Sequence, residues 1–213
     1  MPDDTQPAPI RVLCVDDHPL LLEGVARKIE RQPDMEVVDT AGTGQEALIL
    51  YLRHRPDVVL MDLQMPGMGG LQTIEAIRRE DPNAKIIVLT ILGGDEDIYR
   101  AIHAGAASYL LKSSLSQDLI ATVRKVAAGE RPMPPEVAER LAVREGQSGL
   151  SVREIQILEL IAKGLRNKEI AGELGIGQET VQTHIKRLFV KLQVSDRTAA
   201  VTVALKRGIV HMP

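Results

Sequence analysis

Asp62 ends an apolar run over residues 58–61 and is followed by a turn that contains Pro66 and Gly67. A run of this kind is typical of a strand that is buried on both faces in a parallel sheet. Ligands of such sheets bind outside the carboxyl ends of the strands, which is where Asp62 falls. A buried carboxylate needs a compensating partner, because an isolated buried charge is costly. Asp62 is therefore the candidate reactive group.

Four other side chains with chemical functions follow or end apolar segments: Asp16, Asp17, Thr90 and Lys112. Clustered carboxylates repel one another unless a cation lies among them, and hard oxygen ligands suit Mg²⁺. A carboxylate can attack a phosphoryl group and form an acyl phosphate. A lysine and a hydroxyl group can then bind the phosphoryl oxygens. Each residue alone could be a solvated group at a strand end, but together they predict phosphoryl transfer to Asp62.

These residues must be positioned by elements that alternate between strands and helices along the first 128 residues. The expected strands cover residues 11–15, 36–41, 58–62, 85–90 and 108–111. The expected helices cover about residues 19–32, 44–54, 71–80, 95–104 and 116–128. Five repeats of strand then helix predict an α/β fold, a doubly wound parallel sheet with helices on both faces. Right-handed crossovers favour the flavodoxin-like strand order 2-1-3-4-5, which brings the five reactive side chains to one edge.

Composition agrees with a globular protein that has no membrane segment. The 213 residues are 44% hydrophobic and 26% charged, and the longest apolar run, within residues 86–92, is too short to span a bilayer. Residues 1–9 are acidic and proline-rich, which predicts a disordered tail without a signal peptide. The single cysteine, Cys14, excludes an intramolecular disulfide and is interpreted as a core residue. A cytoplasmic location fits these features.

The charge divides the chain into an acidic body and a basic end. Residues 1–126 carry a net charge of −6, residues 127–148 of −1 and residues 149–213 of +4. This asymmetry indicates a second domain that faces a polyanion. A linker with three prolines separates the two parts, because prolines stop helices and stiffen the chain. The expected organisation is a tail at 1–9, a first domain at 10–128, a linker at 129–149 and a second domain at 150–213.

The basic end has the pattern of a small all-α helix-turn-helix domain. Ser151 and Glu154 fit a capping box at the start of a helix that ends before Gly164. A second helix, over 168–174, is joined through a glycine-bearing turn to a third over 178–192. The third helix combines an apolar stripe with a polar face. From spacing alone, an ordinary amphipathic helix is an equally good interpretation.

The segments around the reactive residues resemble the receiver domain of two-component response regulators over roughly residues 10–128. The matching motifs are Asp16-Asp17, VVLMDLQMPG around Asp62, Thr90, and YLLK from Tyr109 to Lys112. The resemblance implies that a sensor histidine kinase phosphorylates Asp62, with Thr90 and Tyr109 as the switch pair. It also implies that Mg²⁺ is bound by Asp17, Asp62 and the backbone carbonyl of Gln64, with Asp16 assisting through water.

Two features depart from that pattern. Residues 91–94 read ILGG where many receiver domains have an acidic or polar loop, and Ser108 stands where glycine is common. The bulk of Ile91 predicts that the acyl phosphate is shielded from water, and the glycines predict a loosened neighbouring helix.

Residues 149–210 are similar throughout to the LuxR-type helix-turn-helix of the NarL/FixJ response regulators. The resemblance implies that the helix over 178–192 enters the major groove and that the closing helix, over 197–207, forms a dimer contact. A lysine is frequent where this chain has Gln182, and glutamine reads adenine whereas lysine reads guanine. The expected DNA contacts are Lys168, Thr180, Gln182, Thr183, Lys186, Arg187 and Lys191. The implied partners are a sensor histidine kinase, promoter DNA, RNA polymerase and, after phosphorylation, a second copy of the chain.

Three other functions compete with that of a phosphorylation-switched transcription regulator. An aspartyl-nucleophile phosphatase needs a second aspartate two residues after the nucleophile, where this chain has Gln64. A dinucleotide-binding domain needs a G-x-G-x-x-G motif after the first strand, where this chain has Asp16-Asp17-His18-Pro19. A regulator that binds DNA without phosphorylation stays open, although every reactive position is present. The chain is thus expected to be a phosphoacceptor with at most autodephosphorylating activity, not an enzyme.

Overall fold

The computed structural model describes residues 8–90, 94–145 and 149–210. Within them the chain forms two compact units, the first in the ranges 1–92 and 100–138 and the second in the ranges 93–99 and 139–213. Three expected features fall partly outside the described residues, namely the tail at 1–9, the loop at 91–94 and the end of the linker at 129–149.

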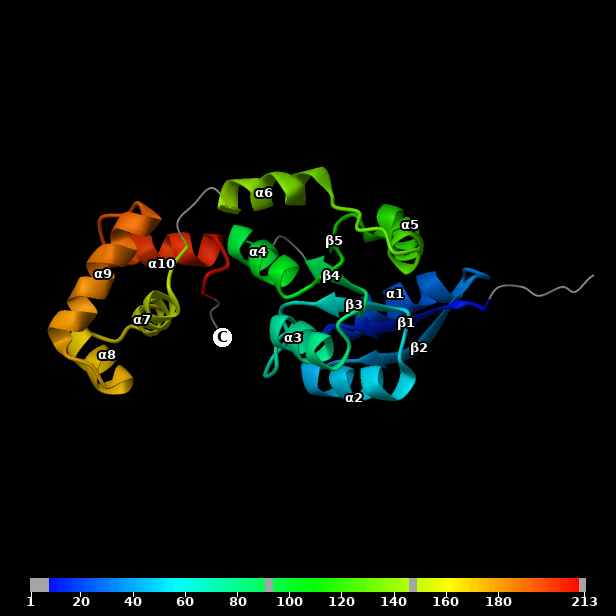
Figure 1. Cartoon of the computed structure of the whole chain (residues 1–213), viewed down its shortest axis with the longest axis horizontal. Coiled ribbons are helices and arrows are strands. Elements are labelled where there is room, and N and C mark those ends of the chain that lie inside the picture. The colour runs from blue at the N-terminus through cyan, green and yellow to red at the C-terminus, as the bar shows by residue number, and fades with distance from the viewer. Residues whose placement is uncertain (1–7, 91–93, 146–148, 211–213) are drawn as a thin grey trace, which may run out of the picture. The chain divides into compact units, whose positions relative to one another are not determined.

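Unit 1 contains a five-stranded parallel sheet in the order β2-β1-β3-β4-β5 (Figure 1). The strands are β1 (Ile10–Val15), β2 (Met35–Ala41), β3 (Val58–Asp62), β4 (Ile86–Thr90) and β5 (Ser108–Leu111). Every residue of β3 and β4 is buried, because neighbouring strands flank them and helices cover both faces. This order confirms the predicted flavodoxin-like, doubly wound arrangement.

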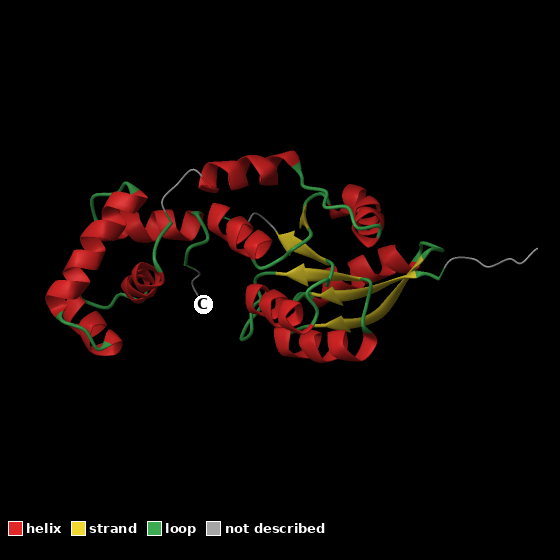
Figure 2. Ribbon diagram, in the orientation of Figure 1, coloured by secondary structure: helices red, strands yellow, loops and turns green. Residues whose placement is uncertain are grey.

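Helices pack on both faces of this sheet (Figure 2). They are α1 (Pro19–Glu30), α2 (Gly44–His54), α3 (Gly70–Glu80) and α5 (Leu115–Ala127), together with the part of α4 (Asp95–His103) that belongs to this unit, from Arg100 onward. Residues of α1 and α5, among them Ile29, Leu119 and Val123, share one hydrophobic core with Val12 and Leu60 of the sheet. Helices α2 and α3 lie side by side in the same unit. The observed ends of the strands and helices differ from the expected ones by no more than two residues.

The first residues of the expected linker are hydrogen-bonded to unit 1 and pack on it. The hydroxyl of Ser108, which is completely buried in β5, donates a hydrogen bond of 2.5 Å to the carbonyl oxygen of Pro132. The ammonium of Lys85 donates to the carbonyl of Ala127 at the end of α5, at 2.6 Å. Val137, near the start of α6 (Pro135–Glu145), is also buried. The first part of residues 129–149 therefore belongs to the packed body of this unit.

Unit 2 contains four helices of a helix-turn-helix fold, α7 (Val152–Ala162), α8 (Asn167–Leu174), α9 (Gln178–Leu192) and α10 (Arg197–Lys206). The predicted capping box is present, because Ser151 Oγ accepts from the backbone of Glu154 and Glu154 accepts from the backbone of Ser151. Gly175 is the C-cap of α8, and its φ of 63°, which favours glycine, allows the sharp turn into α9. Two small hydrophobic cores hold these helices together.

A buried ion pair in unit 2 joins the start of α4 to the end of α6. The guanidinium of Arg144 donates to the two carboxylate oxygens of Glu96 at 2.5 and 3.2 Å, and it lies 4.5 Å from the ring centroid of Tyr99. Both charged residues are buried, which the sequence did not reveal because they stand 48 positions apart. Among the described residues, no helix is long and apolar enough to cross a membrane.

Candidate functional site

The carboxyl edge of the sheet gathers the polar residues on which the sequence argument rested. Asp62 is the last residue of β3 and Thr90 the last of β4, while Asp16 follows β1 and Lys112 follows β5. Asp62, Asp16 and Thr90 are buried, with exposed fractions of 3%, 2% and 6%. The topology therefore places buried carboxylates at the end of an otherwise apolar sheet.

Lys112 supplies the positive charge nearest to these carboxylates. Its Nζ lies 2.7 Å from Asp16 Oδ2 and 3.2 Å from Asp62 Oδ2. Burial disfavours the ammonium, but the hydrogen bond to Asp16 and the charges of Asp62 and Asp16 outweigh burial, so the pKa of Lys112 lies above its usual value. Lys112 therefore stays charged at neutral pH and holds two of the carboxylates together.

Burial has the opposite effect on Asp62. Its removal from water raises the pKa of Asp62, and the neighbouring charge of Asp16 raises it further. The charge of Lys112 and a hydrogen bond from the backbone of Gln64 act in the other direction without cancelling the effect of burial. Burial thus disfavours the charged, nucleophilic form of Asp62, which a neighbouring cation would restore.

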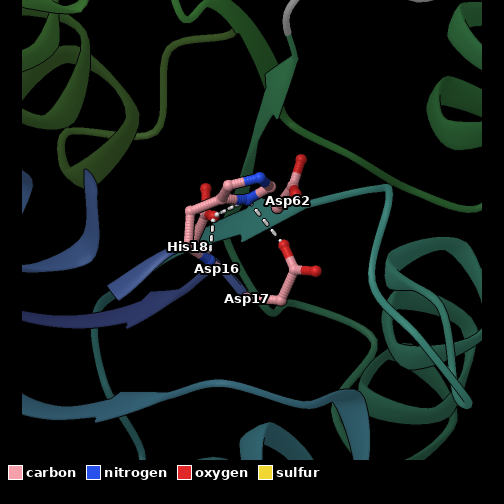
Figure 3. A group of neighbouring side chains, drawn as sticks. All are labelled: Asp16, Asp17, His18 and Asp62. Carbon is pink, nitrogen blue, oxygen red and sulfur yellow. Dashed lines mark hydrogen bonds and ion pairs between the residues drawn. The ribbon is translucent and has the colours of Figure 1, made fainter. Parts of the chain in front are cut away.

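His18 is a member of the site that the sequence argument did not use. Figure 3 shows its imidazole beside the carboxylates of Asp16 and Asp17, with Nδ1 3.1 Å from Asp16 Oδ1 and 2.7 Å from Asp17 Oδ1. The sequence contains a signal for the place of His18. Pro19 is typical of the first turn of a helix, so His18 is expected between the end of the first strand and the start of α1. The segment Asp16-Asp17-His18-Pro19 indicates carboxylates and excludes a dinucleotide-binding motif, but it assigns no role to His18.

The donor set fits a divalent cation. Asp16, Asp17, His18 and Asp62 offer ligand atoms that lie within 4.8 Å of one another. Asp16 Oδ2, Asp17 Oδ1 and Asp62 Oδ2 are buried, and their contacts in the described chain are the ammonium of Lys112 for Asp16 and Asp62 and the imidazole of His18 for Asp17. Three carboxylates face one ammonium, which leaves an excess of two negative charges. Oxygen ligands and this charge balance suit Mg²⁺.

Gly70 allows α3 to begin directly against the backbone of Asp62. A Cβ atom at Gly70 would lie 1.9 Å from the carbonyl oxygen of Asp62 and 2.7 Å from the Cα of Leu63. Such contacts are impossible, so only glycine fits at this position. Gly70 is therefore required by the close approach of the chain to the site, and not only by the turn.

The two expected switch residues lie on adjacent strands. Thr90 ends β4, and its carbonyl oxygen accepts a hydrogen bond of 2.6 Å from the backbone of Lys112. Tyr109 lies in β5 and is completely buried. Ile91, the residue expected to shield the acyl phosphate, lies outside the described residues.

A second set of candidate residues lies on α9, with Lys168 on α8. The buried stripe of α9 consists of Val181, Ile185, Leu188 and Leu192. The exposed residues among the expected DNA contacts are Lys168, Thr180, Gln182, Thr183, Lys186 and Arg187. Within α9 they occupy the side opposite to the buried stripe, as a helix that packs on its own domain and reads a groove requires.

Lys191 differs from the other expected DNA contacts. Its ammonium lies 2.7 Å from Glu154 Oε2 and 3.1 Å from the carbonyl oxygen of Gly149. Burial acts to raise the pKa of Glu154, but the hydrogen bonds from Lys191 and Ser151 outweigh it and hold that pKa below its usual value. The charge of Lys191 is thus already engaged by a buried carboxylate of α7.

Comparisons with known proteins cover both units. The family model described as response regulator receiver domain matches residues 12–124, and that described as bacterial regulatory proteins, luxR family, matches residues 148–204. The chain is 43% identical over 210 residues to the transcriptional regulatory protein LiaR of Bacillus subtilis, with 95% of this chain and 100% of the relative covered. It is 41% identical over 214 residues to the nitrate/nitrite response regulator protein NarP of Escherichia coli, with 97% and 98% covered.

Solved structures show the same similarity. One is RcsB of Salmonella enterica serovar Typhimurium, bound to a promoter in the presence of phosphomimetic BeF₃⁻. It matches with a TM-score of 0.68 and 28% identity over 91% of this chain and 97% of that chain. Another is the response regulator ChrA of a heme-sensing two-component system, with a TM-score of 0.57 and 35% identity over 95% and 100% of the two chains.

Proposed function

Because the chain belongs to the NarL/FixJ family of two-component response regulators, we propose that phosphorylation of Asp62 switches its binding to promoter DNA. The observation that carries this proposal is the buried carboxylate of Asp62, which ends β3 and lies 3.2 Å from the ammonium of Lys112. The donor is the phosphohistidine of a sensor histidine kinase. A regulator that binds DNA independently of phosphorylation is the alternative that the experiments below separate.

The transfer exchanges one phosphorus bond for another. A carboxylate oxygen of Asp62 attacks the phosphorus of the phosphohistidine, the bond from phosphorus to the imidazole nitrogen breaks, and the imidazole leaves. Lys112 and the hydroxyl of Thr90 neutralise and bind the phosphoryl oxygens of the resulting acyl phosphate. Asp17, Asp62 and the backbone carbonyl of Gln64 would hold Mg²⁺, with Asp16 assisting through water. The ion supplies positive charge next to the phosphoryl group. Any loss of the phosphoryl group to water is autodephosphorylation, the only enzymatic activity in this proposal.

The proposed conformational switch consists of movements of Thr90 and Tyr109, which change the surface near β4 and β5. A phosphoryl group on Asp62 draws the hydroxyl of Thr90 toward it, and Tyr109 follows into the space that Thr90 leaves. The phosphoryl group can move this equilibrium only if it binds one of the two arrangements more tightly. Tyr109 is already completely buried in the structure described above. The proposal therefore expects its ring to be exposed in part of the unphosphorylated molecules and buried in the phosphorylated ones, and ring exposure is the quantity that follows the switch.

DNA binding is assigned to α9 of unit 2. Gln182 and Thr183 lie in the first turns of α9, where a recognition helix reaches base edges. Lys168, Thr180, Lys186 and Arg187 are proposed to contact the phosphates around the groove, and Lys191 to do so only in competition with Glu154. Two copies of the chain then bind two half-sites, and bound RNA polymerase is the further partner of the complex. Residues 129–149 are proposed to link the receiver to this DNA-binding domain.

The most general test is the selection of DNA from a random pool by the full-length protein, with and without acetyl phosphate and Mg²⁺. The proposal expects a common sequence, in two copies, to be recovered with the phosphodonor and to be depleted without it. Recovery of the same sequence to the same extent under both conditions would favour the regulator that is independent of phosphorylation.

Replacing Gln182 by alanine is expected to relax the choice of base at one position of each half-site. A glutamine that makes two hydrogen bonds to adenine contributes about 1–3 kcal/mol of discrimination, which alanine cannot provide. Selection of DNA by the variant measures this effect, with Gln178→Ala at the first residue of α9 as the matched control. An unchanged base preference in Gln182→Ala would place a different residue in the groove.

Replacing Lys186 by alanine is expected to weaken binding to all sequences alike. Loss of one phosphate contact reduces the slope of log affinity against log salt concentration by about one. The matched control is Lys191→Ala, whose ammonium pairs with Glu154. It should change the salt slope less and should lower the stability of the domain by about 1–3 kcal/mol, because a buried carboxylate loses its partner. A full change of slope in Lys191→Ala, without a loss of thermal stability, would show that its charge is free for DNA.

A further inference from the structure

The imidazole of His18 occupies the open side of the carboxylate cluster. Lys112, with only 10% of its side chain exposed, pairs with the buried oxygens of Asp16 and Asp62. His18 has 64% of its side chain exposed and contacts Asp16 and Asp17 through Nδ1 (Figure 3). A second nitrogen group therefore lies at the rim of the site, and the proposed phosphoryl transfer does not use it.

The backbone holds His18 in this place. Its N–H donates to Asp16 Oδ1 at 2.9 Å, the same oxygen that Nδ1 approaches. Pro19 follows directly and restricts the residue before it to extended conformations, in agreement with the φ of −98° and ψ of 102° of His18. His18 is also the N-cap of α1. The position of the imidazole thus follows from local chain geometry, and only side-chain rotations remain free.

The distances around Nδ1 are those of hydrogen bonds in the described chain, and they also match the separation of neighbouring ligands of one ion. Adjacent ligands of an octahedral ion with bonds of about 2.1 Å are about 3 Å apart. Nδ1 of His18 lies 2.7 Å from Asp17 Oδ1 and 3.1 Å from Asp16 Oδ1. All ligand atoms of the group, including that of Asp62, lie within 4.8 Å of one another. An ion bound to the carboxylates is therefore within reach of the imidazole.

We propose that His18 provides a nitrogen ligand to the divalent ion of this site and so determines which divalent ions it prefers. The inference rests on the proposed cation site beside Asp62. Carboxylates, carbonyls and water suit Mg²⁺, whereas imidazole favours ions such as Ni²⁺, Co²⁺ and Zn²⁺. A site with His18 as a ligand gains affinity for these transition ions and little for Mg²⁺. The ligand class assigned here is thus a transition-metal ion that competes with Mg²⁺.

The test compares the affinities of the full-length protein for Mg²⁺ and Ni²⁺ by calorimetry, in the wild type and in His18→Asn. Asparagine is a favourable N-cap residue, so this variant preserves the start of α1. Because other histidines can bind nickel, only Ni²⁺ that excess Mg²⁺ displaces is counted. The matched control is His54→Asn, which removes an imidazole that lies 3.2 Å from Asp39, outside the cluster.

We expect His18→Asn to lower the preference for Ni²⁺ over Mg²⁺ by about tenfold, the lower range for loss of a group that tunes a metal site, and His54→Asn to leave it unchanged. Paramagnetic Ni²⁺ should also broaden the ring signals of His18 at lower concentrations than those of other histidines. An unchanged preference in His18→Asn, with Mg²⁺ still bound, would overturn the role of His18 alone. Absence of any Mg²⁺-displaceable ion in the wild type would overturn the proposed cation site itself.

Discussion

Replacing Asp62 by alanine is expected to abolish the uptake of a phosphoryl group from acetyl phosphate in the presence of Mg²⁺. The wild type should gain one phosphoryl group that is stable to acid and labile to base, as an acyl phosphate is. Asp62 is the carboxylate that ends the central strand β3, with a buried side chain and Lys112 at 3.2 Å. Mass spectrometry of the intact protein measures the uptake.

The control for this variant is Asp118→Ala, which removes an exposed carboxylate from the first turn of α5. It should take up the phosphoryl group as the wild type does. Uptake by Asp62→Ala at the wild-type level would show that another residue is the phosphoacceptor, and the assignment of the site would be wrong.

Phosphorylation is expected to convert the chain from a mostly monomeric form into a dimer that binds two half-sites. One small domain buries limited surface on DNA, and two linked domains gain affinity because the second binds at a high effective concentration. A gain of this origin is at least about tenfold and reaches 10²–10⁴ for well-matched spacing. Sedimentation with and without beryllofluoride measures the association, and DNA titration measures the affinity.

Duplexes with one and with two half-sites distinguish dimerisation from a change in affinity within a single DNA-binding domain. A duplex with two half-sites should show the full gain, while a duplex with one half-site should show little. An equal gain on both duplexes would mean that phosphorylation acts on each DNA-binding domain separately. A monomer that persists with beryllofluoride would contradict the dimer directly.

Most of the fold followed from hydrophobic periodicity and turn chemistry. The unbroken apolar segments before Asp62 and Thr90 predict strands that are buried on both faces, and both strands are fully buried. The handedness of the crossovers then predicts the strand order, which is observed. In unit 2 the spacing of Ser151 and Glu154 predicts the capping box, because its hydrogen bonds are local in sequence.

What could not be predicted are the interactions between side chains far apart in sequence. Lys191 looks like a free charge on a basic face, but Glu154, 37 positions away, is buried and holds it. Arg144 and Glu96 form a buried pair across 48 positions. The contact of His18 with Asp16 and Asp17 is local, but it depends on the backbone angles before Pro19 and on the rotamer of the imidazole. Periodicity carries no information on such angles.

The close approach of the backbone to Gly70 could not be predicted from the sequence either. The sequence after Asp62 contains several glycines, which indicate a turn but not which of them is irreplaceable. The carbonyl of Asp62 lies where a side chain of residue 70 would begin, so this glycine is required by contact and not by φ.

The central claim is that phosphorylation of Asp62 controls DNA binding, and one titration tests it most directly. The full-length wild type and Asp62→Ala are each titrated onto a selected two-half-site duplex, with and without beryllofluoride and Mg²⁺. The account predicts at least about a tenfold gain in affinity for the wild type and none for Asp62→Ala. Equal affinity of the wild type under both conditions, or the same gain in Asp62→Ala, would contradict it.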